Sequence, residues 1–154
     1  MMIDIKPGEG FGKVLFGMTR EQVREILGSP DEIETETEDG ENMEHWHYDQ
    51  HEMSVLFSGA DGWKLLSFAV GNPLCTLEGE KLIGLNETQL HDALERLGIS
   101  EELEYEDISS DEFPDHIMVY CNELAMNFWL DAGILSEIQW GPFMKDDETI
   151  DWPV

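Results

Sequence analysis

The chain has 154 residues, with 8 Lys+Arg against 35 Asp+Glu, so its formal net charge is −27. Hydrophobic residues make up 41% of it, which argues against a disordered chain, and no apolar run reaches the length of a membrane span. So negative a chain repels phosphate backbones and anionic membranes. We therefore expect no direct binding of nucleic acid and no membrane contact, and a macromolecular partner should be basic.

The first residues lack a signal-peptide core, and the two cysteines, Cys75 and Cys121, are too few for a disulfide framework. Both features predict a cytoplasmic protein.

Two similar segments, at 16–23 and 83–90, each predict the start of one short helix. Each places a glycine before an N-cap residue, Thr19 or Asn86, and a glutamine follows three residues later, which is the capping-box spacing. Apolar side chains then recur at helical spacing. A glycine, at position 28 or 98, stands where a left-handed C-terminal cap belongs.

Acidic stretches at 31–44 and 101–115 follow the two predicted helices. In the first stretch every second residue of 32–38 is Glu, which is the period of a strand with all its glutamates on one face. Runs rich in strand-forming residues come next. They lie at 43–48, 53–58 and 63–70 in the first half and at 117–120, 124–130 and 134–140 in the second.

The order of these elements predicts an α+β fold. We expect two tandem helix-plus-antiparallel-sheet repeats that share a curved sheet with the helices on one face. The first α-β-β-β repeat covers 12–73 and the second covers 80–142, with a linker at 74–79, and together they form one compact unit. Residues 143–154 are expected to be an acidic C-terminal tail outside the repeats.

The motif GMTREQV at 17–23, with LGSP at 27–30, resembles the helix motif of the small SmpA/OmlA-type lipoproteins. The segments 46–48, 55–57 and 62–65 resemble the three strands of that module. Two such modules in tandem are similar to the architecture of the β-lactamase inhibitor protein family, in which a curved sheet grips a protein with its concave face. Unlike these lipoproteins, the chain is expected to carry neither a signal peptide nor a lipid-bearing cysteine. The resemblance implies a protein-binding sheet and no particular target.

We find no sequence motif for nucleophilic catalysis, phosphate binding or dinucleotide binding, so we expect no enzyme and no cofactor. One weak metal candidate is the set His45, His47 and Asp49. Their spacing of two would place them on one face of a strand, and zinc or nickel accepts such ligands. His-x-His is also common on exposed strands without a metal, so we expect no metal site.

Carboxylates and aromatic side chains are the best candidates for a binding surface. Trp129 is expected to face away from the core, because the alternate residues of its strand are apolar, and Trp63 lies at the edge of a turn. Exposed aromatic rings rimmed by carboxylates suit a protein interface. The candidate partner-binding residues are Glu34, Glu36, Glu38, Asp39, Trp63, Glu104, Glu106, Asp107 and Trp129.

The sequence thus favours a non-catalytic, acidic protein-binding module, such as an inhibitor or immunity-type protein that occludes a basic toxin or enzyme. Two alternatives stay open: a nucleic-acid mimic that blocks many DNA-binding proteins, and a small-ligand or metal sensor built on the strand of His45 and His47. The oligomeric state is not predicted.

Overall fold

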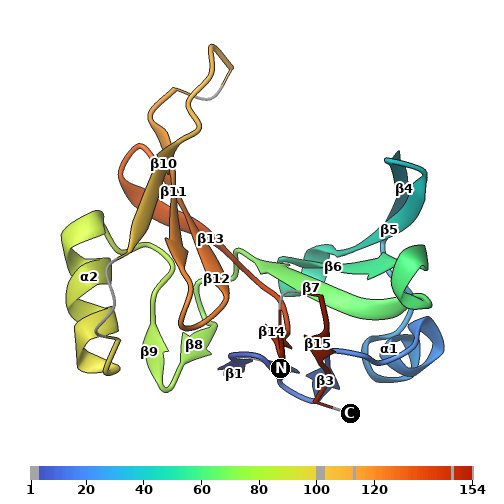
Figure 1. The fold of residues 1–154 in the computed structure, drawn as a ribbon. Coiled ribbons are helices and arrows are strands. Elements are labelled where there is room, and N and C mark those ends of the chain that lie inside the picture. The colour runs from blue at the N-terminus through green and yellow to red at the C-terminus, as the bar shows by residue number, and fades with distance from the viewer. Residues whose placement is uncertain (1–3, 100–102, 113, 147, 154) are drawn as a thin grey trace.

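The computed structural model describes residues 4–99, 103–112, 114–146 and 148–153 (Figure 1). Strands account for 48% of it and helices for 17%, so the molecule is mostly β. The prediction of an α+β fold made of two tandem helix-plus-sheet repeats is therefore wrong. The physical reason is that further strands form outside the predicted repeats. They lie at the start of the chain, in the expected linker and in the expected tail.

Eight antiparallel strands form the large sheet. In sheet order they are β10 (Glu104–Asp107), β11 (His116–Cys121), β12 (Met126–Asp131), β13 (Ile134–Trp140), β7 (Lys64–Val70), β6 (Met53–Ser58), β5 (Glu41–Tyr48) and β4 (Glu32–Glu38). The 3-10 turns η1 (Asp49–His51) and η2 (Gly59–Asp61) connect β5 to β6 and β6 to β7. The six predicted strand segments end within two residues of the observed strands, and the alternating glutamates form β4.

A second sheet of five short strands has the order β3-β2-β1-β8-β9. Its strands are β1 (Asp4–Lys6), β2 (Gly10–Phe11), β3 (Val14–Leu15), β8 (Thr76–Leu77) and β9 (Glu80–Lys81). The β1 and β8 strands pair in parallel, so the expected linker at 74–79 is bound to the start of the chain. The expected tail contains a hairpin of β14 (Phe143–Met144) and β15 (Ile150–Asp151).

The two helices begin at the predicted caps. In α1 (Arg20–Leu27) and α2 (Glu87–Arg96) the N-cap side chain accepts a hydrogen bond from the N3 backbone N–H. The side-chain oxygen of the N3 glutamine accepts a hydrogen bond from the N-cap backbone N–H. Gly98 has φ +86 just after α2, and the next N–H donates to the Leu94 carbonyl, as in a Schellman cap. Neither helix is long and apolar enough to cross a membrane.

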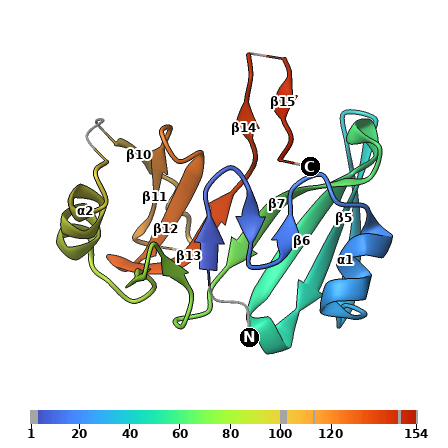
Figure 2. The same ribbon diagram turned by 90° about the horizontal axis from the view of Figure 1, so that it is seen from below.

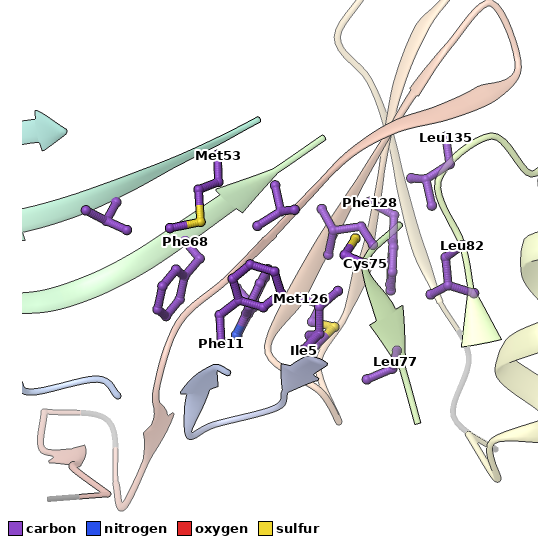
Figure 3. Packing of buried hydrophobic residues seen from close by; sticks show 14 of the residues in the cluster. Ile5, Phe11, Met53, Phe68, Cys75, Leu77, Leu82, Met126, Phe128 and Leu135 are labelled. Atoms are coloured by element: carbon purple, nitrogen blue, oxygen red, sulfur yellow. The ribbon is translucent and has the colours of Figure 1, made fainter. Parts of the chain in front are cut away.

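The hydrophobic core lies between the two sheets. Figure 3 shows Phe68, Met126 and Phe128 of the large sheet meeting Phe11 and other side chains of the small sheet. Seen from below, the N-terminal strands cross the middle of the large sheet, with α1 and α2 at its two ends (Figure 2). One side of the large sheet therefore faces the core.

The seam between β7 and β13 joins the two four-stranded halves of the large sheet. Trp140 of β13 lies opposite Phe68 of β7, and their rings stack with centroids 5.1 Å apart. Phe11 packs edge-on against Trp140 at 5.7 Å, and the Trp140 Nε1–H donates to the Gly10 carbonyl at 3.2 Å. Both halves and the small sheet thus share one aromatic cluster.

The other side of the large sheet is not covered by either helix or by the small sheet. In Figure 1 the β10–β11 end and the β4–β5 end both rise on this side of the seam, so the surface is concave. We call it the open face, since most of the side chains that strand alternation places on it are exposed or half-buried. They include Glu34, Glu36, His45, His47, Ser54, Ala69, Gln139, Glu137, Asn127, Trp129, Met118, Tyr120, Glu104 and Glu106.

Candidate protein-binding face

The open face brings together five of the residues proposed from the sequence. Glu34 and Glu36 lie at its β4 edge, Glu104 and Glu106 lie at its β10 edge, and Trp129 lies between the seam and β10. The open-face side chains named above include no Lys or Arg. The face is therefore acidic at both ends.

The other four candidates lie elsewhere or at its margin. Glu38 is the last residue of β4, and Asp39 follows it in the turn with φ +51. Trp63 stands on the side of α1, where the Arg20 guanidinium lies 4.4 Å from its ring centroid. The Asp107 carboxylate accepts a hydrogen bond from the Ser109 backbone N–H at 3.0 Å, and bonding to Ser109 lowers its pKa.

At the β4–β5 end, imidazoles and carboxylates pair with one another. His47 Nε2 lies 3.1 Å from a Glu34 oxygen, and His45 Nε2 lies 2.9 Å from a Glu36 oxygen. His47 Nδ1 also meets the Ser54 hydroxyl at 2.6 Å. The polar groups of this end therefore find partners within the chain.

The sequence proposed His45, His47 and Asp49 as metal ligands, and the structure groups different residues. Ligand atoms of Glu32, Glu34 and His47 lie within 4.8 Å of one another. Asp49 instead begins η1, and its backbone N–H donates to an Asp31 oxygen at 2.8 Å. Two carboxylates and one imidazole form a donor set that zinc accepts, although exposed acidic groups often cluster without an ion.

At the β11–β13 end, the open face is hollowed by a depression of about 500 Å³. It is lined by Ile108, His116, Trp129, Ser136, Glu137 and Gln139. The His116 ring stands edge-on to Trp129, with centroids 5.8 Å apart. The Trp129 Nε1–H is shielded from solvent and has no hydrogen-bond partner among the residues that the structure describes. Such a donor is uncommon in a folded protein.

Glu137 lies in this depression directly opposite Trp129 in the β12–β13 register. Its carboxylate accepts a hydrogen bond from Gln139 Nε2 at 3.2 Å. Partial burial raises the pKa of Glu137, although the Gln139 bond and the nearby His116 act in the opposite direction. A half-buried carboxylate beside an indole ring is a suitable receptor for a cation.

Sequence reasoning proposed Trp129 but missed Glu137 and Gln139. The sequence could have indicated their positions. Ile138 and Trp140 are core residues, paired with Val70 and Phe68, so strand alternation leaves 137 and 139 on the opposite face. The hollow around them depends on the shape of the whole sheet, so no local pattern indicates it.

The two cysteines are poor candidates for a nucleophile. Cys75 and Cys121 are both buried. Burial raises the pKa of the Cys75 thiol to about 11, which keeps it protonated and a poor nucleophile. Comparison with protein-family models, with curated proteins and with solved structures gives no match, so the resemblance noted from the sequence has no further support.

Proposed function

We propose that this chain is a non-catalytic protein-binding module that occludes a basic protein, as an inhibitor or immunity-type protein does. The observation that carries the proposal is the open face. One side of an eight-stranded sheet is packed on the core, whereas the side chains of the other side are mostly unburied and are acidic at both ends. A sheet fixed from behind by a core is rigid, so a partner would meet a preformed surface.

The dimensions of the open face support this proposal. Eight adjacent strands span roughly 34 Å, and strands of about six residues are roughly 20 Å long. The resulting area of about 700 Å² is close to the roughly 800 Å² that each partner contributes to a standard interface. The concave shape suits a convex partner or a protruding loop (Figure 1).

Charge supports a basic partner. A net charge of −27 steers basic proteins toward the chain and repels nucleic acid and anionic membranes. In this proposal the carboxylates take the place of the partner's own anionic substrate, and Trp129 fills part of its cleft. We place the protein in the cytoplasm, because its only two cysteines, Cys75 and Cys121, are buried thiols rather than a disulfide framework.

The test is capture of a partner from a lysate of the native host on the immobilised chain, with elution by a salt gradient. The captured protein is then purified, and its affinity is measured for two matched variants. Ala69→Arg puts a long cationic side chain at the centre of the open face, whereas Thr88→Arg makes the same change in charge on the exposed surface of α2.

We expect one basic protein to elute late in the gradient. Ala69→Arg should weaken its affinity for the chain at least about tenfold, and Thr88→Arg should change that affinity less than about twofold. Equal effects of the two variants would contradict an open-face interface. Release of many basic proteins at low salt would favour the nucleic-acid mimic instead.

The cluster of Glu32, Glu34 and His47 supports a second candidate, a metal-sensing module. The probe is ZnCl2, followed by calorimetry and by thermal unfolding. We expect zinc to raise the melting temperature, and His47→Ala to abolish the rise, if this candidate is correct. His51→Ala is the control, because His51 ends η1 and lies outside the cluster. Equal responses of both variants would mean diffuse attraction of the cation to an acidic chain.

A further inference from the structure

We propose that the depression at the β11–β13 end of the open face is the seat of an arginine side chain of the basic partner. The inference rests on the proposed function and specifies the chemical group that this part of the face recognises. The guanidinium would pair with Glu137 and stack on Trp129, which lie opposite each other on β13 and β12.

The first observation is a carboxylate that no Lys or Arg of the chain neutralises within the described ranges. Within the described ranges, no Lys or Arg lies at ion-pair distance from Glu137, although the carboxylates of Glu44 and Glu80 each meet an arginine at 2.9 Å. Glu137 is half-buried, and Gln139 supplies a neutral hydrogen bond only. Withdrawing a carboxylate from water is costly, and a guanidinium that forms charge-assisted hydrogen bonds offsets that cost.

The second observation is that the chain already contains the complete arrangement elsewhere. Arg20 stacks on Trp63 with its guanidinium 4.4 Å from the ring centroid, and the same group binds a Glu44 oxygen at 2.9 Å. The depression provides the indole and the carboxylate of this trio, Trp129 and Glu137, and leaves a hollow where the arginine would lie. Its volume of about 500 Å³ leaves room for one long side chain.

The geometry favours arginine over lysine. A guanidinium is planar, so it can lie flat on the Trp129 indole while its edge faces Glu137 and the Gln139 side chain. An ammonium is a compact, strongly hydrated charge and gains less from a flat aromatic surface. The Trp129 ring is held by packing alone among the described residues, since its Nε1–H has no partner there.

The test uses three capped peptides, Gly-Arg-Gly, Gly-Lys-Gly and Gly-citrulline-Gly, titrated into the full chain at pH 7.5. Binding is followed by NMR through the indole N–H resonance of Trp129, which is assigned with Trp129→Phe. We expect the arginine peptide to shift this resonance with a dissociation constant on the order of millimolar. The neutral citrulline peptide, which has the same shape, should bind at least about tenfold more weakly.

Two variants distinguish binding of arginine in the depression from general attraction to the negative charge of the chain. Glu137→Gln keeps the size of the side chain and should weaken arginine binding at least about tenfold. Glu95→Gln removes the same charge from an exposed site on α2, outside the open face, and should change arginine binding less than about twofold. Equal effects of the two variants, or equal affinity for the arginine and lysine peptides, would overturn the inference.

The captured partner separates this inference from the proposed function. If Ala69→Arg weakens the affinity of the partner and Glu137→Gln leaves that affinity unchanged, the inference of an arginine-binding depression is wrong. The open-face interface is then still supported. If no partner is captured while the arginine peptide still binds at Trp129, the proposed function alone is overturned.

Discussion

The two ends of the open face carry similar kinds of side chain in different states. At the β4–β5 end, His45 and His47 each meet a carboxylate, at 2.9 and 3.1 Å. At the β11–β13 end, no Lys or Arg of the described residues lies at ion-pair distance from Glu137, and the Trp129 Nε1–H has no acceptor there. At the β4–β5 end the polar side chains have partners within the chain, whereas at the β11–β13 end the Trp129 donor lacks a partner among the described residues.

This difference indicates where binding energy resides. Polar groups that pair within the chain gain little from a partner, because binding must first break or displace the existing contacts. Groups left unpaired in a partly buried position gain the most. We therefore expect the β11–β13 end to dominate the affinity of a partner and the β4–β5 end to act mainly through the long-range field of its charge.

The largest expected effect comes from breaking the seam that joins the two ends. Trp140→Ala removes a buried ring that packs on Phe68 and Phe11 and donates a hydrogen bond to the Gly10 carbonyl. Large-to-small changes of this kind cost about 3–5 kcal/mol of unfolding free energy. Urea denaturation followed by near-UV circular dichroism measures the loss.

We expect a single transition for both halves of the sheet, because they share this aromatic cluster. Trp152→Ala, at a half-buried indole beside Lys64, is the control and should cost less. Two separate unfolding transitions in the unmodified chain would show that the two ends fold independently. They would then not be parts of one rigid face.

Local signals predicted the elements of this molecule better than its architecture. The caps at Thr19 and Asn86 predicted both helix starts, because a capping box is completed by a few neighbouring residues. The alternating glutamates predicted β4, and the runs rich in strand-forming residues predicted β6 and β13, because these signals also lie within a few neighbouring residues.

The tandem-repeat interpretation failed where pairing is remote in sequence. The pairing of β1 with β8 joins positions 4–5 to positions 76–77 in strands of only three and two residues. Such short strands have no period to detect, so 74–79 was read as a linker. The arginine seat was hidden for the same reason, since its lining comes from three strands and a loop whose arrangement the whole sheet determines.

A second prediction concerns Trp129 itself. Trp129→Ala should make the binding free energy of the captured partner less favourable by about 2 kcal/mol, which is about thirtyfold in affinity. Aromatic anchors at interfaces contribute effects of that size. It should lower the free energy of unfolding less than Trp140→Ala does, since Trp129 is only half-buried. Calorimetric titration and urea denaturation of the same variant give both values. A loss of folding equal to that of Trp140→Ala would assign Trp129 to the core.

A third prediction follows from the burial of Glu137, which raises the pKa of its carboxyl above the ordinary value of 4.5. Below pH 4.5 the carboxyl is neutral in the folded and unfolded chain, so its ionisation costs no stability. As pH rises through the folded-state pKa, ionisation is penalised in the folded chain and stability is lost. Glu137→Gln removes this penalty, so it should unfold at higher urea than the unmodified chain at pH 7 and at similar urea near pH 4.

Glu106→Gln controls for relief of the general negative charge, because Glu106 is exposed on the same face. At pH 7, Glu137→Gln should raise the free energy of unfolding more than Glu106→Gln does. If the two variants behave alike at both pH values, Glu137 is not distinguished by burial, and the comparison between the two ends loses its electrostatic basis.

The smallest expected effect concerns the satisfied end. His47→Ala removes the contacts to Glu34 and Ser54 but leaves the carboxylate of Glu34 and its charge in place. Half-exposed pairs of this kind contribute less than about 1 kcal/mol, so thermal unfolding should shift only slightly. Because the field of the carboxylates is unchanged, the affinity of the partner should stay within about twofold. A tenfold fall in affinity without a matching loss of stability would mean that the β4–β5 end also contacts the partner directly, so that pairing within the chain does not exclude a residue from the interface.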